Sequence, residues 1–158
     1  MIPWQKLSLG EEIYTHVDEQ NVTRHFAIKR LNDWLPSSGL KTMWNTITEE
    51  DVHCALTNRG VEMPRVISME PSWRDKPVVC AEWRLFGKGV VGVITLDGNH
   101  RFVRRYLDGF RNIEMYLVPR KAWEKFCVAG LPDTTHERIR NAPPVAEATA
   151  RHGVAFER

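Results

Sequence analysis

The sequence predicts an α+β domain in which a small mixed sheet is flanked by helices. Two observations support this fold class. Strand-patterned and helix-patterned segments are intermingled along the 158 residues, as in α+β and α/β domains. The length also suits one domain whose core needs no disulfides. We expect this domain to span residues 1–132 and residues 133–158 to form a tail, because Ala142-Pro143-Pro144 interrupts regular structure.

The first elements are expected to be a strand and a helix. Residues 12–17 alternate and contain strand-forming side chains. Asn21 could then cap a helix over residues 22–35. The turn residues at 36–39 would end this helix, and the pattern over 40–47 fits neither element clearly. The buried stripe of the helix would comprise Phe26, Leu31, Trp34 and Leu35.

A second helix is predicted to begin after Thr48, which precedes the acidic first turn Glu49-Glu50-Asp51. It would point Val52, Ala55 and Leu56 inward and end near Asn58-Arg59-Gly60. A short strand over 64–69 and a loop over 71–77, which holds Trp73, are expected to follow.

The second half of the chain has the clearest patterning. Strands over 78–83 and 90–96 are expected to form a hairpin around a turn at 86–89. The next helix would run from Asn99 to Asp108, and Gly109 is suited to a left-handed cap at its end. A strand over 113–118 and a helix from Pro119 through Phe126 would complete the domain.

Charge and cysteine content limit the classes of function. A net charge of +2 is too small to indicate nucleic-acid binding by itself. Cys54, Cys80 and Cys127 are far apart and have no metal-binding spacing, so we expect buried free thiols in a reducing compartment. No apolar run suggests a signal peptide or a membrane span. The expected location is the cytoplasm, either of a cell or of a host infected by a phage.

The most informative motif is Asp97-Gly98-Asn99-His100-Arg101, between the apolar run 90–96 and a helical pattern. The first N–H groups of a helix lack intrahelical acceptors and attract anions. Arg101 could add a bidentate contact to a phosphate, and Asp97 could hold a metal ion or accept a proton. The motif therefore predicts a phosphate site, although Asp-Gly is also a common turn dipeptide.

Three arginines follow on the same predicted helix. Arg101 and Arg105 lie one turn apart and, with Arg104, would form a basic ridge, while Val103, Tyr106 and Leu107 would be buried. The ridge could reach a second phosphate or a nucleic-acid backbone, or it could be a solvated helix face. Trp73 could likewise stack on a ligand or simply pack at the rim of the core.

The motif, Gly109 and the strand at 113–118 together resemble the ParB/sulfiredoxin superfamily over roughly Met63 to Val128. The resemblance implies a core over 62–128, with Glu62-Met63-Pro64-Arg65-Val66-Ile67 similar to the strand before the motif. The five residues are closest to the Asp-Gly-His-His-Arg motif of free serine kinases and differ from it at Asn99. Sulfiredoxins have a cysteine at that position, which argues against their reductase chemistry. ParB proteins carry a separate helix-turn-helix domain, and we expect none here.

The resemblance implies a nucleotide-binding phosphotransferase that uses ATP, or another nucleoside di- or triphosphate, with Mg²⁺. Asp97 and His100 would be catalytic, with Asp97 also the metal ligand. The acceptor would be a small molecule or a nucleic acid, and the oligomeric state is left open. A base could come from Glu12, Glu19 or Glu82. The implied nucleotide-binding residues are Gly98, Asn99, His100, Arg101 and Arg105.

Two other functions stay open at this stage. Some ParB-like domains are nucleases, so the chain could be a ParB-like protein of a phage or mobile element that binds, cleaves or modifies DNA. The basic ridge is the feature that supports this alternative. A domain that has lost catalysis and binds a partner protein is the third possibility, and the intact Asp97 and His100 argue against it.

Overall fold

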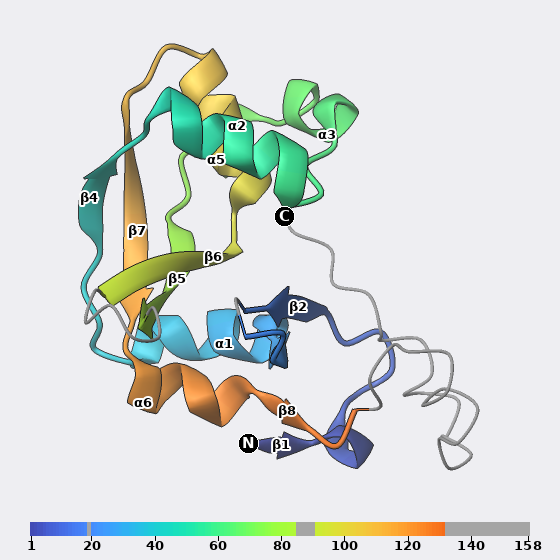
Figure 1. The fold of residues 1–158 in the computed structure, drawn as a ribbon. Helices are drawn as coiled ribbons and strands as arrows, with labels where there is room; N and C mark the ends of the chain where they lie inside the picture. The colour runs from blue at the N-terminus through green and yellow to red at the C-terminus, as the bar shows by residue number, and fades with distance from the viewer. Residues whose placement is uncertain (19, 85–90, 132–158) are drawn as a thin grey trace. The chain divides into compact units, whose positions relative to one another are not determined.

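A computed structural model describes residues 1–18, 20–84 and 91–131 (Figure 1). The described part is a mixed α/β structure that contains a four-stranded mixed sheet flanked by helices, as the sequence predicts. Its contacts form two compact units. Unit 1 comprises Met1–Trp34 and residues 121–131, and unit 2 comprises the described residues between 35 and 120. The motif at 97–101 lies in unit 2.

The sheet of unit 2 has the strand order β4-β7-β5-β6. The strands are β4 (Met43–Thr46), β5 (Val78–Arg84), β6 (Val91–Asp97) and β7 (Asn112–Val118). The two central strands, β5 and β7, are parallel, while β4 and β6 each run antiparallel to their single neighbour. The predicted pairing of β5 with β6 is therefore confirmed, and the predicted turn at 86–89 lies outside the described residues.

One register shift occurs in β6 directly before the motif. Cys80 lies opposite Thr95, whereas Val79 lies opposite Asp97, so Leu96 is an extra residue in the edge strand. A bulge of this kind bends a strand and redirects the side chains beside it, and bulges are frequent next to functional sites. The strand is thus distorted at the point where the chain turns into the next helix.

The helices of unit 2 are α2 (Glu49–Asn58), α3 (Met63–Ile67), α4 (Pro71–Arg74) and α5 (Asn99–Leu107). The central helix is α5, which contacts the other three as well as β5 and β7, and Figure 1 shows it beside α2. The predicted N-cap of α2 is confirmed, because Thr48 and Asp51 form a reciprocal capping box. Buried side chains of the sheet and helices form one core: Ile47, Val52, Ala55, Val66, Val78, Cys80, Val103, Ile113 and Met115.

Unit 1 is built around an antiparallel hairpin of β2 (Ile13–Val17) and β3 (Thr23–Ala27). Its other elements are β1 (Ile2–Pro3), η1 (Trp4–Lys6), α1 (Ile28–Trp34), η3 (Glu124–Phe126) and β8 (Val128–Ala129). Phe26 is fully buried, with its ring 6.2 Å from that of Tyr14 and 5.7 Å from that of Trp123. Two further elements, η2 (Leu35–Ser37) and α6 (Arg120–Trp123), lie at the boundaries of the units.

The helix predicted over residues 22–35 is wrong in its first part. Residues Thr23–Ala27 form β3, and the helix α1 begins only at Ile28. Asn21 adopts a left-handed conformation with φ of 59° in the hairpin turn, where an asparagine is tolerated. Tertiary pairing with β2 therefore overrides the helical spacing of the apolar residues.

The strand predicted over 64–69 is also wrong, because Met63–Ile67 form the helix α3. Pro64 stands in the first turn, where its missing N–H costs nothing and its fixed φ favours a helix. The loop predicted over 71–77 contains another short helix, α4, which again begins with a proline. The superfamily resemblance places a strand at 62–67, so this part of it is not matched by the structure.

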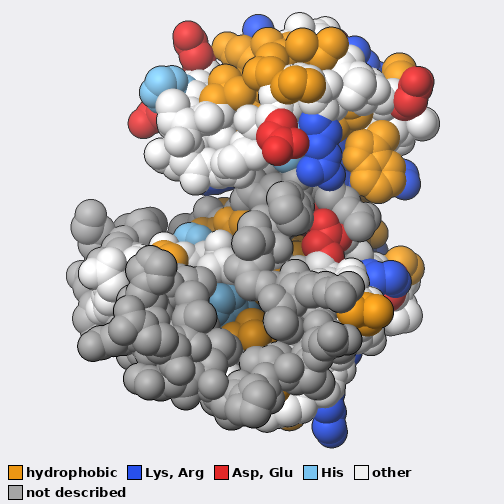
Figure 2. Space-filling model, turned by 90° about the vertical axis from the view of Figure 1, so that its right-hand side faces the viewer, with side chains coloured by type: hydrophobic (Ala, Val, Ile, Leu, Met, Phe, Trp, Pro, Cys, Tyr) orange, Lys and Arg blue, Asp and Glu red, His pale blue; other side chains and the backbone are white. Residues whose placement is uncertain are grey.

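The remaining predicted elements occur with small shifts in their ends. Gly109 adopts the predicted left-handed conformation, with φ of 92°, after α5. Two residues expected in the core are instead exposed: Leu56 at 41% and Leu107 at 55%. Figure 2 shows hydrophobic side chains gathered on the surface at the top of the view. No helix within the described ranges is both long and apolar enough to cross a bilayer.

The three cysteines are free thiols, and they differ in burial. Burial raises the pKa of both Cys80 and Cys127 to about 11, whereas Cys54 is half-exposed on α2. Because the thiolate is the reactive form, we expect Cys54 to react first with a thiol reagent at pH 8. Mass spectrometry of the labelled chain checks this prediction. Initial labelling that is unchanged in Cys54→Ser would contradict it.

Candidate functional site

Gly98 forms the turn between β6 and α5. Its φ and ψ are 107° and 16°, a left-handed conformation that favours glycine. A Cβ at this position would lie 2.6 Å from Cγ1 of Val78 and 2.9 Å from Nη2 of Arg101. Because no side chain fits there, Gly98 is required for both the backbone conformation and the close packing of the turn.

The helix α5 begins without a side-chain cap. Its N-cap residue is Gly98, and its first intrahelical hydrogen bond runs from the N–H of Phe102 to the carbonyl of Gly98. The N–H groups of residues 99–101 precede that bond and have no carbonyl four residues earlier within the helix. This is the arrangement that favours an anion at a helix N-terminus.

The polar side chains of the motif are buried within unit 2. Relative exposure is 4% for Asp97, 0% for Asn99, 1% for His100 and 4% for Arg101. Polar groups buried to this extent require partners, since an unsatisfied one costs about 1–3 kcal/mol. The motif is thus a packed polar cluster, and the contacts of each side chain define what it can do.

Arg101 forms an ion pair with Asp97. Its Nη2 lies 3.2 Å from Oδ2 of Asp97, and its guanidinium carbon lies 5.5 Å from the ring centroid of Trp73. The ion pair spans the Gly98 turn and joins the end of β6 to the first turn of α5. Trp73 lies against the cations of Arg101 and Lys76 in this structure.

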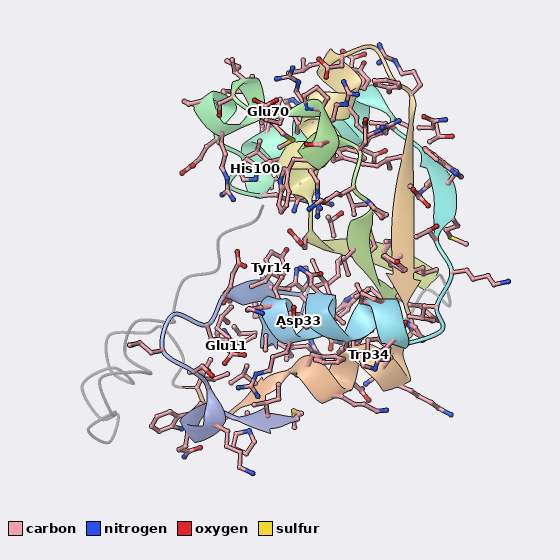
Figure 3. All side chains as sticks on the ribbon, turned by 180° about the vertical axis from the view of Figure 1, so that it is seen from behind. Glu11, Tyr14, Asp33, Trp34, Glu70 and His100 are labelled. Atoms are coloured by element: carbon pink, nitrogen blue, oxygen red, sulfur yellow. The ribbon has the colours of Figure 1, made fainter. Side chains whose placement is uncertain are left out.

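His100, which is labelled in Figure 3, lies on α5 and contacts the segment before α3. Its Nε2 accepts a hydrogen bond of 3.1 Å from the backbone N–H of Glu62. This nitrogen is therefore unprotonated in the arrangement described, and the imidazole positions the N-cap residue of α3.

Asn99 contacts a residue that the sequence did not single out. Nη1 of Arg59, the C-cap residue of α2, donates to Oδ1 of Asn99 at 3.3 Å and to Oγ1 of Thr95 at 3.2 Å. Nδ2 of Asn99 is buried and has no hydrogen-bond partner among the described residues. The donor from Arg59 fixes which side of the amide is oxygen, so the unsatisfied group is the NH₂.

The other two arginines of the predicted basic ridge are occupied by structural contacts. Arg104 pairs with Asp108 and donates to the carbonyls of Val66 and Ile67. Arg105 is buried, pairs with Asp75 at 2.9 Å, and donates to the carbonyl and side-chain oxygens of Asn112. These contacts hold α5 against α3 and the start of β7.

Side-chain hydrogen bonds from Arg104 and Arg74 hold the pKa of Asp108 below its ordinary value. Asp75 has a lowered pKa as well, chiefly because Arg74 donates to it. Both carboxylates are therefore charged at neutral pH, and they pair with Arg74, Arg104 and Arg105. The arginines of the ridge thus have carboxylate partners within their own unit.

The acidic residues considered for metal binding and catalysis come from separate parts of the chain. Within the described ranges, no three His, Cys, Asp or Glu side chains lie together in a way that could hold a metal ion. Asp97 is the one acidic residue of the motif. Of the candidate bases, Glu82 lies on β5 and Glu12 belongs to unit 1, while Glu19 is outside the described residues.

Arg59 is the residue that sequence reasoning missed, since it was noted only as the end of a helix. Arg59 and Asn99 are 40 positions apart in the sequence, and no local pattern relates the two. Only the packing of α2 beside α5 brings its guanidinium to Asn99.

Comparisons with protein-family models, curated proteins and solved structures gave no significant match. The class of protein that the fold and the site define is therefore a mixed α/β protein with a buried polar motif at a strand–helix turn.

Proposed function

We propose that this chain is a nucleotide-binding enzyme of the phosphotransferase type, with phosphate groups bound at the N-terminus of α5. The observation that carries the proposal is the turn at Gly98, where an uncapped nine-residue helix begins directly after the carboxylate of Asp97. Backbone N–H groups and the helix dipole favour an anion at this position. The resemblance of residues 97–101 to the free serine kinase motif supports the same assignment.

Each residue of the motif has a defined part in this proposal. Gly98 lets the backbone approach the phosphate, and Asn99 offers its unsatisfied amide N–H groups. His100 holds the segment before α3, and Arg101 fixes the turn through Asp97. Phosphoryl transfer depends mainly on positioning and charge neutralisation, so a rigid turn of this kind suits it.

We assign one of two roles to Asp97. It either binds Mg²⁺ or accepts the proton of the hydroxyl group that receives the phosphate. Mg²⁺ in nucleotide sites is commonly held by one or two carboxylates together with phosphate oxygens, so a single aspartate is compatible with it. The ion would supply charge neutralisation on the phosphates. Arg101 neutralises Asp97 in the structure. To bind Mg²⁺, Asp97 would have to exchange Arg101 for the metal ion.

The proposal is tested by calorimetric titration of the full chain with ATP, ADP, CTP and GTP in the presence of Mg²⁺. The informative variant is Asn99→Asp, which keeps the shape of the side chain and adds a negative charge where the phosphate would lie. We expect it to weaken nucleotide binding by at least about tenfold, because like charges placed together repel. The matched control is Asn45→Asp, the same change on the exposed strand β4 of the same unit.

Binding of none of the four nucleotides would refute the proposal, as would equal affinity in Asn99→Asp and the unchanged chain. Transfer itself is followed as ADP formation from Mg²⁺-ATP with a panel of small hydroxyl compounds. The three arginines that suggested a DNA-acting protein are each paired with a carboxylate, which argues against that alternative.

A further inference from the structure

Arg59 joins three elements beside the proposed phosphate position. It ends α2, and its Nη1 donates to Thr95 on β6 and to Asn99 at the first position of α5. Arg59 and Thr95 are half-buried, whereas the motif residues 97–101 are buried. Arg59 and Thr95 are therefore the more accessible of the residues that contact one another here.

The charge of Arg59 differs from that of the arginines on α5. Arg101, Arg104 and Arg105 each form an ion pair within unit 2, but Arg59 forms none with any residue in the described ranges. Its hydrogen-bond acceptors are a hydroxyl and an amide oxygen, both neutral. A guanidinium beside the positive end of α5 is unfavourable there; the negative end of α2 offsets part of this cost, and an anion would offset more.

Asn99 supplies a second and independent observation. Its Nδ2 has no acceptor among the described residues although the residue has no exposed surface. This NH₂ belongs to the same planar amide whose oxygen accepts from Arg59, so the two donors lie next to each other. A buried donor beside a cation that has no carboxylate partner in the described ranges forms a site to which an anion with several acceptor oxygens is suited.

We propose that Arg59 is a phosphate-binding residue. Because the charge of Arg101 is used in its ion pair with Asp97, Arg59 supplies the positive charge that faces the phosphate. This inference rests on the proposed function, because it places the phosphate at the same helix N-terminus. A terminal phosphate would receive hydrogen bonds from Arg59 and Asn99 together with backbone N–H groups of α5. Arg101 would then act as a positioning residue that fixes the turn.

The test compares Arg59→Gln and Arg59→Lys with the unchanged chain in calorimetric titrations with Mg²⁺-ATP and with pyrophosphate. We expect Arg59→Gln to weaken both ligands by about tenfold to a hundredfold, the usual size of a charge-assisted hydrogen bond. Arg59→Lys keeps the charge but loses the planar fork of the guanidinium. Its affinity for both ligands should therefore lie between those of Arg59→Gln and the unchanged chain. The matched control is Arg111→Gln, the same change beyond the other end of α5.

The outcomes separate this inference from the proposed function. Nucleotide binding that is unchanged in Arg59→Gln overturns the role of Arg59 and leaves the proposed function standing. Pyrophosphate binding that depends on Arg59, without any preference for nucleotides, supports Arg59 and counts against a nucleotide enzyme. If neither ligand binds to the unchanged chain, both are overturned.

A role of Arg59 limited to the C-terminus of α2 would lower the melting temperature of Arg59→Gln and leave ligand affinity unchanged. That result would overturn the inference as well. Thermal melts of all variants, recorded without ligand, are therefore part of the experiment.

Discussion

Substitution of Gly98 by alanine is expected to destabilise the chain by about 3–5 kcal/mol, since two separate costs add. The first is the left-handed backbone, with φ of 107°, which an L-residue with a side chain rarely adopts. The second is steric, because the new Cβ would lie 2.6 Å from Cγ1 of the buried Val78. Urea unfolding of the full chain, followed by tryptophan fluorescence, measures the loss.

Gly109 at the other end of α5 separates the two costs. Its φ is 92°, but a Cβ there would have no neighbour within 4 Å. Gly109→Ala should therefore lose only the backbone part, about 1–2 kcal/mol. Adding Val78→Ala to Gly98→Ala should recover part of the steric cost. If Gly98→Ala were no more destabilising than Gly109→Ala, close packing at the turn would be disproved.

Breaking the ion pair between Asp97 and Arg101 is the second change with a large expected effect. The two side chains are only 6% and 5% exposed, so removal of one charge leaves the other buried without this ion pair. We expect Asp97→Asn and Arg101→Met each to cost about 3–5 kcal/mol in the free energy of unfolding. The double variant should lose less than the sum, because neither charge then remains.

The pair Lys29–Asp33 is the matched control, since it has the same i,i+4 spacing but side chains that are 65% and 64% exposed. Asp33→Asn should change the stability by less than about 0.5 kcal/mol, because solvent screens an exposed pair. If Asp97→Asn and Asp33→Asn lowered the free energy of unfolding equally, the ion pair with Asp97 would not be required to keep Arg101 buried. The phosphate-binding role first predicted for Arg101 would then be favoured over a structural one.

Local sequence signals were sufficient where one short segment contains all the interactions that matter. Thr48 and Asp51 form a capping box within one helical turn, and Thr48 followed by an acidic first turn predicted the start of α2. Gly98 and Gly109 could be placed at turns because few other residues adopt a positive φ. The apolar run before Asp97 likewise predicted β6, since its patterning is local.

Local signals failed where tertiary contacts decide between two possible structures. Thr23–Ala27 have apolar spacing that fits a helix, yet they pair with β2 as a strand. Val66 and Ile67 favour a strand, yet Pro64 and the contact with α5 place them in a helix. In both cases the intrinsic preference is small compared with the burial that packing against a neighbour provides.

The sequence by itself determined the α+β class, the β6–turn–α5 arrangement and the polar residues that the motif brings together. The partners of those residues depended on the tertiary structure. The packing of unit 2 pairs Arg101 with Asp97 and Arg105 with Asp75, and it brings His100 within hydrogen-bond distance of the backbone N–H of Glu62. The same packing brings Arg59 to Asn99, which is 40 positions away in the sequence. Such pairings follow from how helices pack on a sheet, and a motif read along the chain carries no information about them.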